Sequence, residues 1–366
     1  MKNTFGHNVS VTLFGESHGS YIGAMLDGLA PGIPVDEDFI ARQLTLRRPV
    51  GGIGTPRREQ DRFSVVSGVY RGKTTGTPLC ILIPNEDTDS AAYAPLHGVA
   101  RPGHADFTAQ CKYHGFQDDR GGGHFSGRLT AALVAVGAVA TAALQQRDIR
   151  IGTHILRCGG IADRGFGNLT SDIDLLNRSA FAVLDTQAAE QMQQAITRAA
   201  AEHDSIGGVL ETAVTGMPSG VGEPWFDTVE GLLSHALFSI PAVKGVEFGA
   251  GFSMAEGRGS EYNDPFAMEN GVVVTKTNHN GGVNGGITNG MPLLFRCAVK
   301  PTPSIEREQQ TVDFLHHENT TISIHGRHDP AIVHRARVVV DSVTALVLCD
   351  LLTSRFGTDW LGGDVR

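Results

Sequence analysis

Three short motifs place a histidine or an aspartate in a tight turn, where these side chain types can carry general acid–base chemistry. They are Gly15-Glu-Ser-His-Gly19, Arg101-Pro-Gly-His-Ala-Asp106 and Gly326-Arg-His-Asp-Pro330. The candidate catalytic residues are His18, His104 and Asp329, because imidazole titrates near neutral pH and a carboxylate beside cations can hold or pass a proton. Two alternatives stay open. Most histidines are hydrogen-bonded structural residues, and Asp329 can simply cap its turn.

Arginines crowd one early segment of the chain. Residues 40–73 hold eight basic side chains, and the acidic ones among them are Glu59 and Asp61. Guanidinium groups bind carboxylate and phosphate in a two-pronged geometry, so this cluster indicates a small anionic ligand. A solvated surface with ion pairs is the alternative. The formal net charge of −9 argues against nucleic-acid binding, which requires broad neutralisation of phosphates.

Glycine-rich loops are frequent, but they do not match the known nucleotide-binding patterns. The run Gly68-Val-Tyr-Arg-Gly-Lys-Thr74 has one residue too few for a P-loop and leads into an apolar strand-like run. No strict GxGxxG precedes a helix, so a Rossmann site is not supported. The loop at 121–128 leads directly into an alanine-rich helix, however, and its amides are suited to bind an anion.

The cysteines and the apolar runs bear on compartment and metal content. Five widely spaced cysteines form no CxxC pair, and HExxH is absent, so we expect no disulfide framework and no metal site. The N-terminus lacks the pattern of a secretory signal. The apolar run at 131–144 is shorter than the roughly 20 residues that span a bilayer, and we expect a buried helix there. These features predict a cytoplasmic protein without membrane contact.

Hydrophobic periodicity predicts an α+β fold with mostly antiparallel sheets, because groups of strands are separated by single helices. Strands are expected at 9–14, 63–70, 79–83, 209–214, 245–248, 272–275, 293–299 and 336–340. Helices are expected at 36–47, 129–146, 188–203, 228–238, 306–318 and 343–353. The length permits one large unit or two domains.

Seven motifs, read in order, resemble the chorismate synthase family nearly from end to end. They are Phe14-Gly-Glu-Ser-His-Gly19, Arg101-Pro-Gly-His-Ala-Asp106, Gly121-Gly-Gly123, Val243-Lys-Gly-Val-Glu247, Gly285-Gly286, Lys300-Pro-Thr-Pro-Ser304 and Gly326-Arg-His-Asp-Pro330. The resemblance implies helices sandwiched between antiparallel sheets, one domain over residues 1–366, and a cytoplasmic homotetramer. It implies an anti 1,4-elimination of phosphate from 5-enolpyruvylshikimate 3-phosphate, which gives chorismate and requires reduced flavin mononucleotide (FMN).

The resemblance also implies roles for particular residues. His18 and His104 would be general acids toward the reduced flavin and the departing phosphate, in an order left open, and Asp329 would help to move a proton through flavin N5. Flavin contacts carry over to His124, Phe125, Ser126, Pro241, Ala242, Gly285, Lys300, Pro301, Thr302, Pro303, Ser304 and Arg327. Basic residues for the substrate or for NADPH, a possible flavin reductant, are Arg47, Arg48, Arg101 and Arg128.

The chain departs from the family pattern in three places. Many members have Arg-Ser-Ser-Ala-Arg after the triple glycine, where this chain has His124-Phe-Ser-Gly-Arg128. The segment after Arg48 is one residue shorter than in members that carry a further arginine there. A late glutamate position holds Asp341, which keeps the charge.

Overall fold

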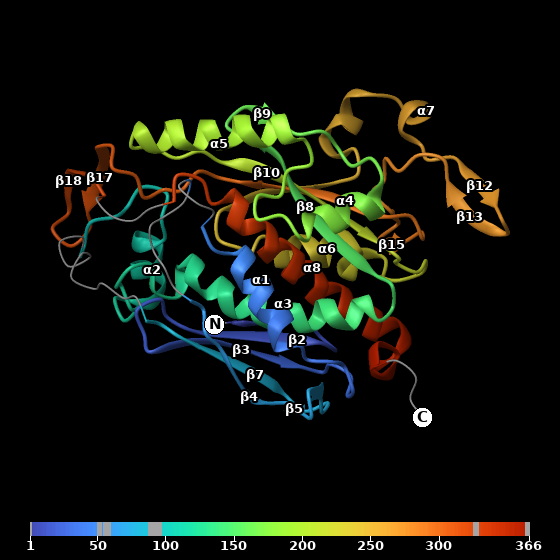
Figure 1. Cartoon of the computed structure of the whole chain (residues 1–366). Helices are drawn as coiled ribbons and strands as arrows, with labels where there is room; N and C mark the ends of the chain where they lie inside the picture. The colour runs from blue at the N-terminus through green and yellow to red at the C-terminus, as the bar shows by residue number, and fades with distance from the viewer. Residues whose placement is uncertain (1, 50–52, 54–59, 87–96, 325–328, 363–366) are drawn as a thin grey trace.

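Two five-stranded sheets lie on either side of a layer of helices, as Figure 1 shows for a computed structural model of the chain. The structure describes residues 2–49, 53, 60–86, 97–324 and 329–362. Each pairing between the described strands is antiparallel. The predicted fold class is therefore confirmed.

The first sheet is built from the N-terminal quarter of the chain. Its strands, in spatial order, are β1 (Thr4–Phe5), β2 (Ser10–Gly15), β3 (Tyr21–Asp27), β7 (Leu79–Pro84) and β4 (Ser64–Ser67). The strand expected at 63–70 ends early because Gly68 has a φ of +82° and lies against the backbone of Leu79. Beyond Gly68, β5 (Val69–Tyr70) pairs instead with β6 (Lys73–Thr74).

The second sheet comes from the middle of the chain and is accompanied by three separate hairpins. Its strands, in order, are β11 (Val243–Phe248), β16 (Leu293–Val299), β10 (Gly208–Thr215), β8 (Arg150–Cys158) and β9 (Ile161–Ala162). The hairpins are β12 (Phe266–Glu269) with β13 (Val272–Thr275), β14 (Val283–Asn284) with β15 (Ile287–Thr288), and β17 (Gln309–Asp313) with β18 (Glu318–Ile322).

Helices fill the space between the sheets and cover one outer face. The inner helices are α1 (Glu37–Leu46), α3 (Thr130–Gln145), α6 (Val229–Leu237) and α8 (Val333–Phe356), and further helices are α2 (Asp106–Tyr113), α4 (Leu169–Leu176), α5 (Thr186–Ala201) and α7 (Gly259–Tyr262). Side chains of Asp36, Asp185 and Thr228 accept hydrogen bonds from the first turns of α1, α5 and α6, which fixes where these helices begin.

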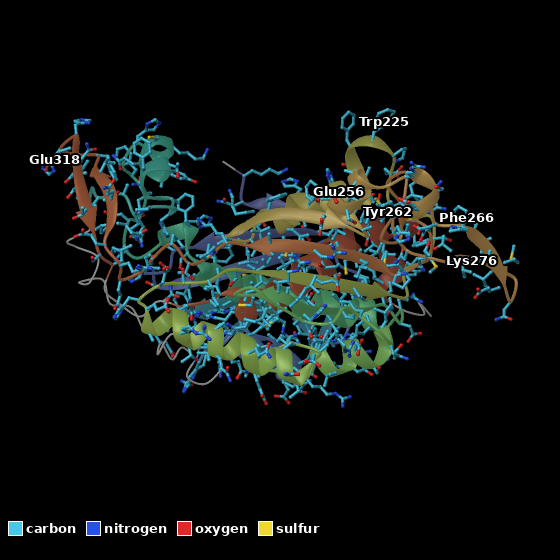
Figure 2. The ribbon with its side chains drawn as sticks, turned by 90° about the horizontal axis from the view of Figure 1, so that it is seen from above. Trp225, Glu256, Tyr262, Phe266, Lys276 and Glu318 are labelled. Atoms are coloured by element: carbon cyan, nitrogen blue, oxygen red, sulfur yellow. The ribbon has the colours of Figure 1, made fainter. Side chains whose placement is uncertain are left out.

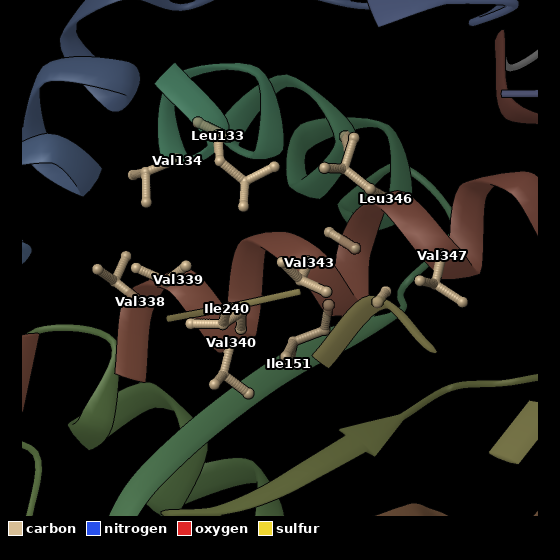
Figure 3. Packing of buried hydrophobic residues seen from close by; sticks show 14 of the residues in the cluster. Leu133, Val134, Ile151, Ile240, Val338, Val339, Val340, Val343, Leu346 and Val347 are labelled. Atoms are coloured by element: carbon tan, nitrogen blue, oxygen red, sulfur yellow. The ribbon is translucent and has the colours of Figure 1, made fainter. Parts of the chain in front are cut away.

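The core is centred on the crossing of α3 and α8, where Leu133, Val339, Val343 and Leu346 gather (Figure 3). The two helices approach closely at Gly137, because a Cβ there would lie 2.3 Å from Cβ of Ser342. Buried apolar residues from both sheets join this one cluster. The shared core supports a single unit over residues 1–366, which stays a prediction.

Two predicted elements are wrong. The run at 336–340, expected as a strand, belongs to α8, which is buried on nearly all sides, so its β-branched residues show no helical period. The helix expected at 306–318 is the start of the β17–β18 hairpin, whose half-exposed strands carry polar residues without clear alternation. The helix expected at 343–353 is the second half of α8, which begins ten residues earlier at Val333, and the remaining predicted strands and helices appear with ends shifted by a few residues.

Two parts of the chain project from the sandwich at opposite ends. Figure 2 shows Glu318 on the β17–β18 hairpin at one end and Phe266 with Lys276 on the β12–β13 side at the other. One helical stretch in the described part, Gly127–Gln145, is long and apolar enough to cross a membrane, but it is 78% buried inside the protein. It therefore serves as a core helix, as the sequence predicts.

Candidate active site

A cleft of about 1090 Å³ runs along the N-terminal halves of α3 and α8. One part of its lining is apolar and includes Leu133, Val339 and Leu346, and the lining also contains arginines, lysines and histidines. Most residues predicted from the sequence meet in its lining: Arg47, Arg101, His104, His124, Phe125, Ser126, Arg128, Pro241, Ala242, Lys300, Thr302, Pro303, Ser304 and Asp329. Segments that are more than 200 residues apart in the sequence thus form one site.

Four predicted residues do not line this cleft, and a fifth cannot be placed. His18 lies just behind the wall, because a Cβ on the lining residue Gly121 would be 2.2 Å from Cε1 of His18. Arg48, Pro301 and Gly285 lie outside the lining. Gly285 occupies the turn of the β14–β15 hairpin with a φ of +62°. Arg327 lies outside the described residues.

His104 is held by its own motif at the start of α2. Nδ1 of His104 lies 2.9 Å from Oδ1 of Asp106, and Arg101 donates to Asp106 through Nε and Nη2 at 2.8 and 2.6 Å. Burial alone would raise the pKa of Asp106, but hydrogen bonds from Arg101 and His104 hold that pKa well below its usual range. The carboxylate therefore stays ionised and orients both Arg101 and His104.

Asp329 stands at the start of α8 and pairs with Arg335. Arg335 also donates from Nε to the carbonyl oxygen of Arg47 at 2.8 Å, which ties the end of α1 to α8. His334, next along the helix, is fully buried, and burial lowers its pKa to about 4. Because His334 is neutral near pH 7, the charge beside Asp329 comes from Arg335.

The loop at 121–130 explains how this chain uses its unusual His124. Nδ1 of His124 donates to the carbonyl oxygen of Gly15 at 2.8 Å, so the ring fastens the loop to the end of β2. Oγ of Ser126 accepts from the amide of Arg128 at 3.2 Å, which caps the turn that leads into α3. The phenyl ring of Phe125 packs edge-on against Tyr113 with centroids 6.1 Å apart.

Three arginines of the cleft are buried, which is unusual for cationic side chains. Arg47, Arg101 and Arg128 are 6%, 8% and 5% exposed. A buried guanidinium is stable only when anions or hydrogen-bond acceptors face it. Asp61 faces Arg47 and Arg128, and Asp106 faces Arg101, so all three guanidiniums have a carboxylate partner in the wall of the cleft.

A buried hydroxyl donor and a strained backbone position, both in the cleft lining, indicate a ligand site. Oγ1 of Thr302 is buried and has no hydrogen-bond partner among the described residues, although it lines the cleft beside Ser304. Ala242 has a φ of +75°, a region that L-residues rarely adopt, and its carbonyl oxygen accepts from the amide of Lys300. Such strain concentrates at ligand sites. Within the described ranges, no group of three or more His, Cys, Asp or Glu side chains is placed to hold a metal ion.

Sequence reasoning missed several residues of this site. Asp61 lies between Arg47 and Arg128, and Asn85 contacts Arg128. Asp61 was visible as one of the few acids in the arginine-rich segment, whereas Asn85 carries no sequence signal. His235 and Lys244 also line the cleft; His235 stands in no recognisable motif, whereas Lys244 belongs to the motif Val243-Lys-Gly-Val-Glu247, from which no site residue was predicted.

Comparisons with known proteins agree with one another. A family model described as chorismate synthase matches residues 9–353. The chorismate synthase of Pyrococcus abyssi is 46% identical over 350 residues, covering 96% of this chain and 97% of that protein. That of Methanosarcina acetivorans is 45% identical over 356 residues, covering 97% of each. A crystal structure of chorismate synthase superposes with a TM-score of 0.77 at 30% identity, covering 97% of this chain and 94% of that one.

Proposed function

Because this chain belongs to the chorismate synthase family, we propose that the cleft around His104 and Asp329 holds the substrate together with reduced FMN. Members of this family are carbon–oxygen lyases of aromatic amino acid biosynthesis. They convert 5-enolpyruvylshikimate 3-phosphate to chorismate by 1,4-elimination. One C–O bond to phosphate and one C–H bond break, and a new double bond forms.

The observation that carries this assignment is the convergence of three buried arginines on one cleft that also holds His104 and Asp329. The substrate has two carboxylates and one phosphate, and a buried guanidinium matches each of these groups in charge and in hydrogen-bonding geometry. The apolar part of the lining excludes water and strengthens these interactions. The arginines therefore bind and orient the substrate.

The residues present also fit a flavin. The buried hydroxyl of Thr302, with Ser304 and Lys300 nearby in sequence, supplies donors for the FMN phosphate. Phe125 and Pro241 supply flat apolar surface for the ring system. When bound, reduced flavin supplies the transient electron density that the elimination needs, without net oxidation.

His104 is the general acid that the geometry favours in the cleft itself. Its Nδ1 is held by Asp106, so Nε2 is the atom that meets a ligand and can transfer a proton to it. His18 acts from behind the wall, where Oγ of Ser17 lies 3.0 Å from its Nδ1. Asp329, paired with Arg335, lines the same cleft and is the carboxylate that can accept and pass on a proton there. Which histidine serves the phosphate and which serves the flavin stays open.

Further parts of the proposal concern partners and place. We expect a homotetramer, as the family resemblance implies, and NADPH as a possible reductant that contacts the Arg47 and Arg48 region. A cytoplasmic location is consistent with a biosynthetic enzyme and with its unpaired cysteines in the described part of the chain.

An anaerobic assay tests the proposal directly. Purified protein receives substrate with chemically reduced FMN, and then substrate with oxidised FMN and NADPH, while phosphate release and chorismate absorbance are followed. Product in the first condition is the expected result. Product in the second condition as well shows that the enzyme reduces its own flavin. A properly folded protein that releases no phosphate in either condition contradicts the proposal.

A further inference from the structure

Asp61 occupies a central position that none of the site assignments above explains. Its carboxylate lies between two cleft arginines, 3.3 Å from Nη2 of Arg47 through Oδ2 and in contact with Nη1 of Arg128 through Oδ1. The residue is buried, and its backbone has a φ of +48°, which a non-glycine residue rarely adopts. The protein therefore holds this carboxylate in place against both desolvation and backbone strain.

A hydrogen-bond network connects Asp61 to the turn that carries His18. Nδ2 of Asn85 donates to the carbonyl oxygens of Glu16 and Gly19, which flank His18, at 2.9 and 2.8 Å. Oδ1 of Asn85 accepts from Nε of Arg128 at 2.9 Å. Arg128 then meets Asp61.

The same hydrogen-bond network continues from Asp61 to Asp329. Asp61 accepts from Arg47, whose carbonyl oxygen accepts from Nε of Arg335, and Arg335 pairs with Asp329. The network thus connects the His18 turn to Asp329, although the two lie more than 300 residues apart in the sequence. Within this network, Asp61 is the carboxylate that lies between two guanidinium groups, those of Arg47 and Arg128.

We propose that Asp61 is a positioning residue for the elimination: it fixes Arg47 and Arg128 in the orientation that receives the anionic substrate. This inference rests on the proposed function, which assigns both arginines to that substrate. Arg128 is held at three atoms, by Asn85, Asp61 and the carbonyl oxygen of Pro84, and both arginines line the cleft. Without Asp61, two like charges would face each other in a low-dielectric wall and turn apart.

The opposite role for Asp61 predicts a change of substrate affinity in the opposite direction. If Asp61 were an internal competitor that occupies the arginines until the substrate displaces it, removal of its charge would strengthen substrate binding. If it positions them, removal weakens binding. Because Asp61 touches the arginines and not the reacting atoms, the effect belongs in KM more than in kcat.

The experiment compares steady-state kinetics of wild type, Asp61→Asn and Asp61→Glu under anaerobic conditions with chemically reduced FMN. We expect Asp61→Asn to raise KM for the substrate by about 10- to 100-fold, the scale of a small misplacement of binding groups. We expect kcat to change by less than about threefold, and Asp61→Glu to recover part of the loss. Asp174→Asn removes the acid of an exposed ion pair with Arg150 and serves as the matched control.

An unchanged or lowered KM in folded Asp61→Asn overturns the inference, and so does a loss that appears in kcat alone. If Asp61→Asn does not fold, Asn85→Ala carries the test through Arg128. A rise in KM of about threefold or more then supports the inference, and an unchanged KM overturns it. The wild-type protein separates a failure of the proposed function from a failure of the Asp61 inference. The proposed function fails only if the wild type forms no product.

Discussion

At the scale of single residues, the site depends on carboxylates that orient cations. Asp106 holds Arg101 and His104, Asp61 holds Arg47 and Arg128, and Asp329 pairs with Arg335. Burial alone would raise the pKa of Asp61, but the charges of Arg47 and Arg128 outweigh it and lower that pKa. Asp61 and Asp106 therefore remain ionised, and they hold Arg47, Arg101 and Arg128 in one orientation.

Replacement of His104 tests its role as a general acid. We expect His104→Ala to lower turnover by about 10² to 10⁴, the usual range for loss of such a group, with little change in FMN affinity. The measurement is chorismate formation with chemically reduced FMN. His316→Ala, which alters an exposed histidine of the β17–β18 hairpin, is the control. Turnover equal to the wild-type rate would remove His104 from the mechanism.

Replacement of Thr302 tests the flavin assignment. Because its buried hydroxyl lacks a partner among the described residues, Thr302→Val removes a donor reserved for a ligand. A hydrogen bond to a charged phosphate contributes about 1.5–3 kcal/mol, so we expect FMN affinity to fall at least about tenfold. Isothermal titration with oxidised FMN measures the change. Thr197→Val on the exposed face of α5 is the control, and equal affinity in both variants would place the phosphate elsewhere.

The motif residues of the site could be predicted from the sequence, but their supports could not. His104, Asp329 and the residues 302–304 stand in recognisable motifs and do meet in the cleft. Asn85 and Arg335 contribute through contacts with distant segments, and only the fold brings those segments together. Gly285 illustrates the reverse case, because its motif matches but its turn lies outside the cleft lining.

At the scale of elements, a row of charges crosses the outer face of the second sheet. His154 on β8 contacts Asp163 and Glu211, and Arg296 on β16 joins Glu211 to Glu247 on β11. Burial alone would lower the pKa of His154, but hydrogen bonds to the two carboxylates raise it above its ordinary value. These side-chain contacts link the neighbouring strands β8, β10, β16 and β11, in addition to the backbone hydrogen bonds of the sheet.

The pH dependence of stability should reveal this row. The raised pKa of His154 means that its contribution is complete below pH 6.5 and is lost as pH rises through the folded pKa. The lowered pKa of Glu211 means that its contribution is complete above pH 4.5 and is lost as pH falls through the folded pKa. The row therefore stabilises the fold most between pH 4.5 and pH 6.5.

We expect His154→Gln to lower the free energy of unfolding by about 3 kcal/mol at pH 6, because it leaves the buried Asp163 without a cation and removes one of the two cations beside Glu211. The penalty should be smaller at pH 9 than at pH 6, because the wild type loses the charge-dependent part of this contribution as pH rises through the folded pKa of His154. Urea unfolding at both pH values measures it. His316→Gln, which alters an exposed pair with Asp313, should have little effect. A penalty that is equal at both pH values would show that packing, not charge, dominates.

Helices and strands were predicted correctly from the sequence where one face of the element is buried. The prediction failed where the element is buried on all sides or only slightly buried. The amphipathic helix α5 and the alternating strand β16 appear close to their expected ends. In α8, burial on all sides removes the period and leaves only the β propensity of Val338, Val339 and Val340. In β17, partial exposure of both faces removes the alternation.

At the scale of the whole molecule, the two sheets and the α3–α8 pair make one core, and the cleft opens along that pair. The site therefore takes its walls from both halves of the chain. The sequence indicated an α+β class through the order of its elements, whereas the strand order of each sheet arises from long-range pairing that local patterns do not encode.

The exposed β12–β13 hairpin tests the proposed homotetramer. Phe266, Met268, Val272 and Val273 are each more than half exposed on this projecting element, and such apolar patches mark contact surfaces. We expect Met268→Glu to shift the mass measured by light scattering toward smaller species while the monomer stays folded. Glu318→Ala on the hairpin at the opposite end should leave the mass unchanged. An unaltered tetramer in Met268→Glu would move the interface elsewhere.

The central claim is that one cleft holds FMN and the anionic substrate at the same time. Titration of the wild-type protein with oxidised FMN, in the absence and in the presence of saturating substrate, tests it most directly because no product forms. We predict that both ligands bind together, with one FMN per chain and an affinity equal to or higher than that without substrate. Displacement of FMN by the substrate, or FMN binding that is unaffected by both the substrate and Thr302→Val, would contradict the account.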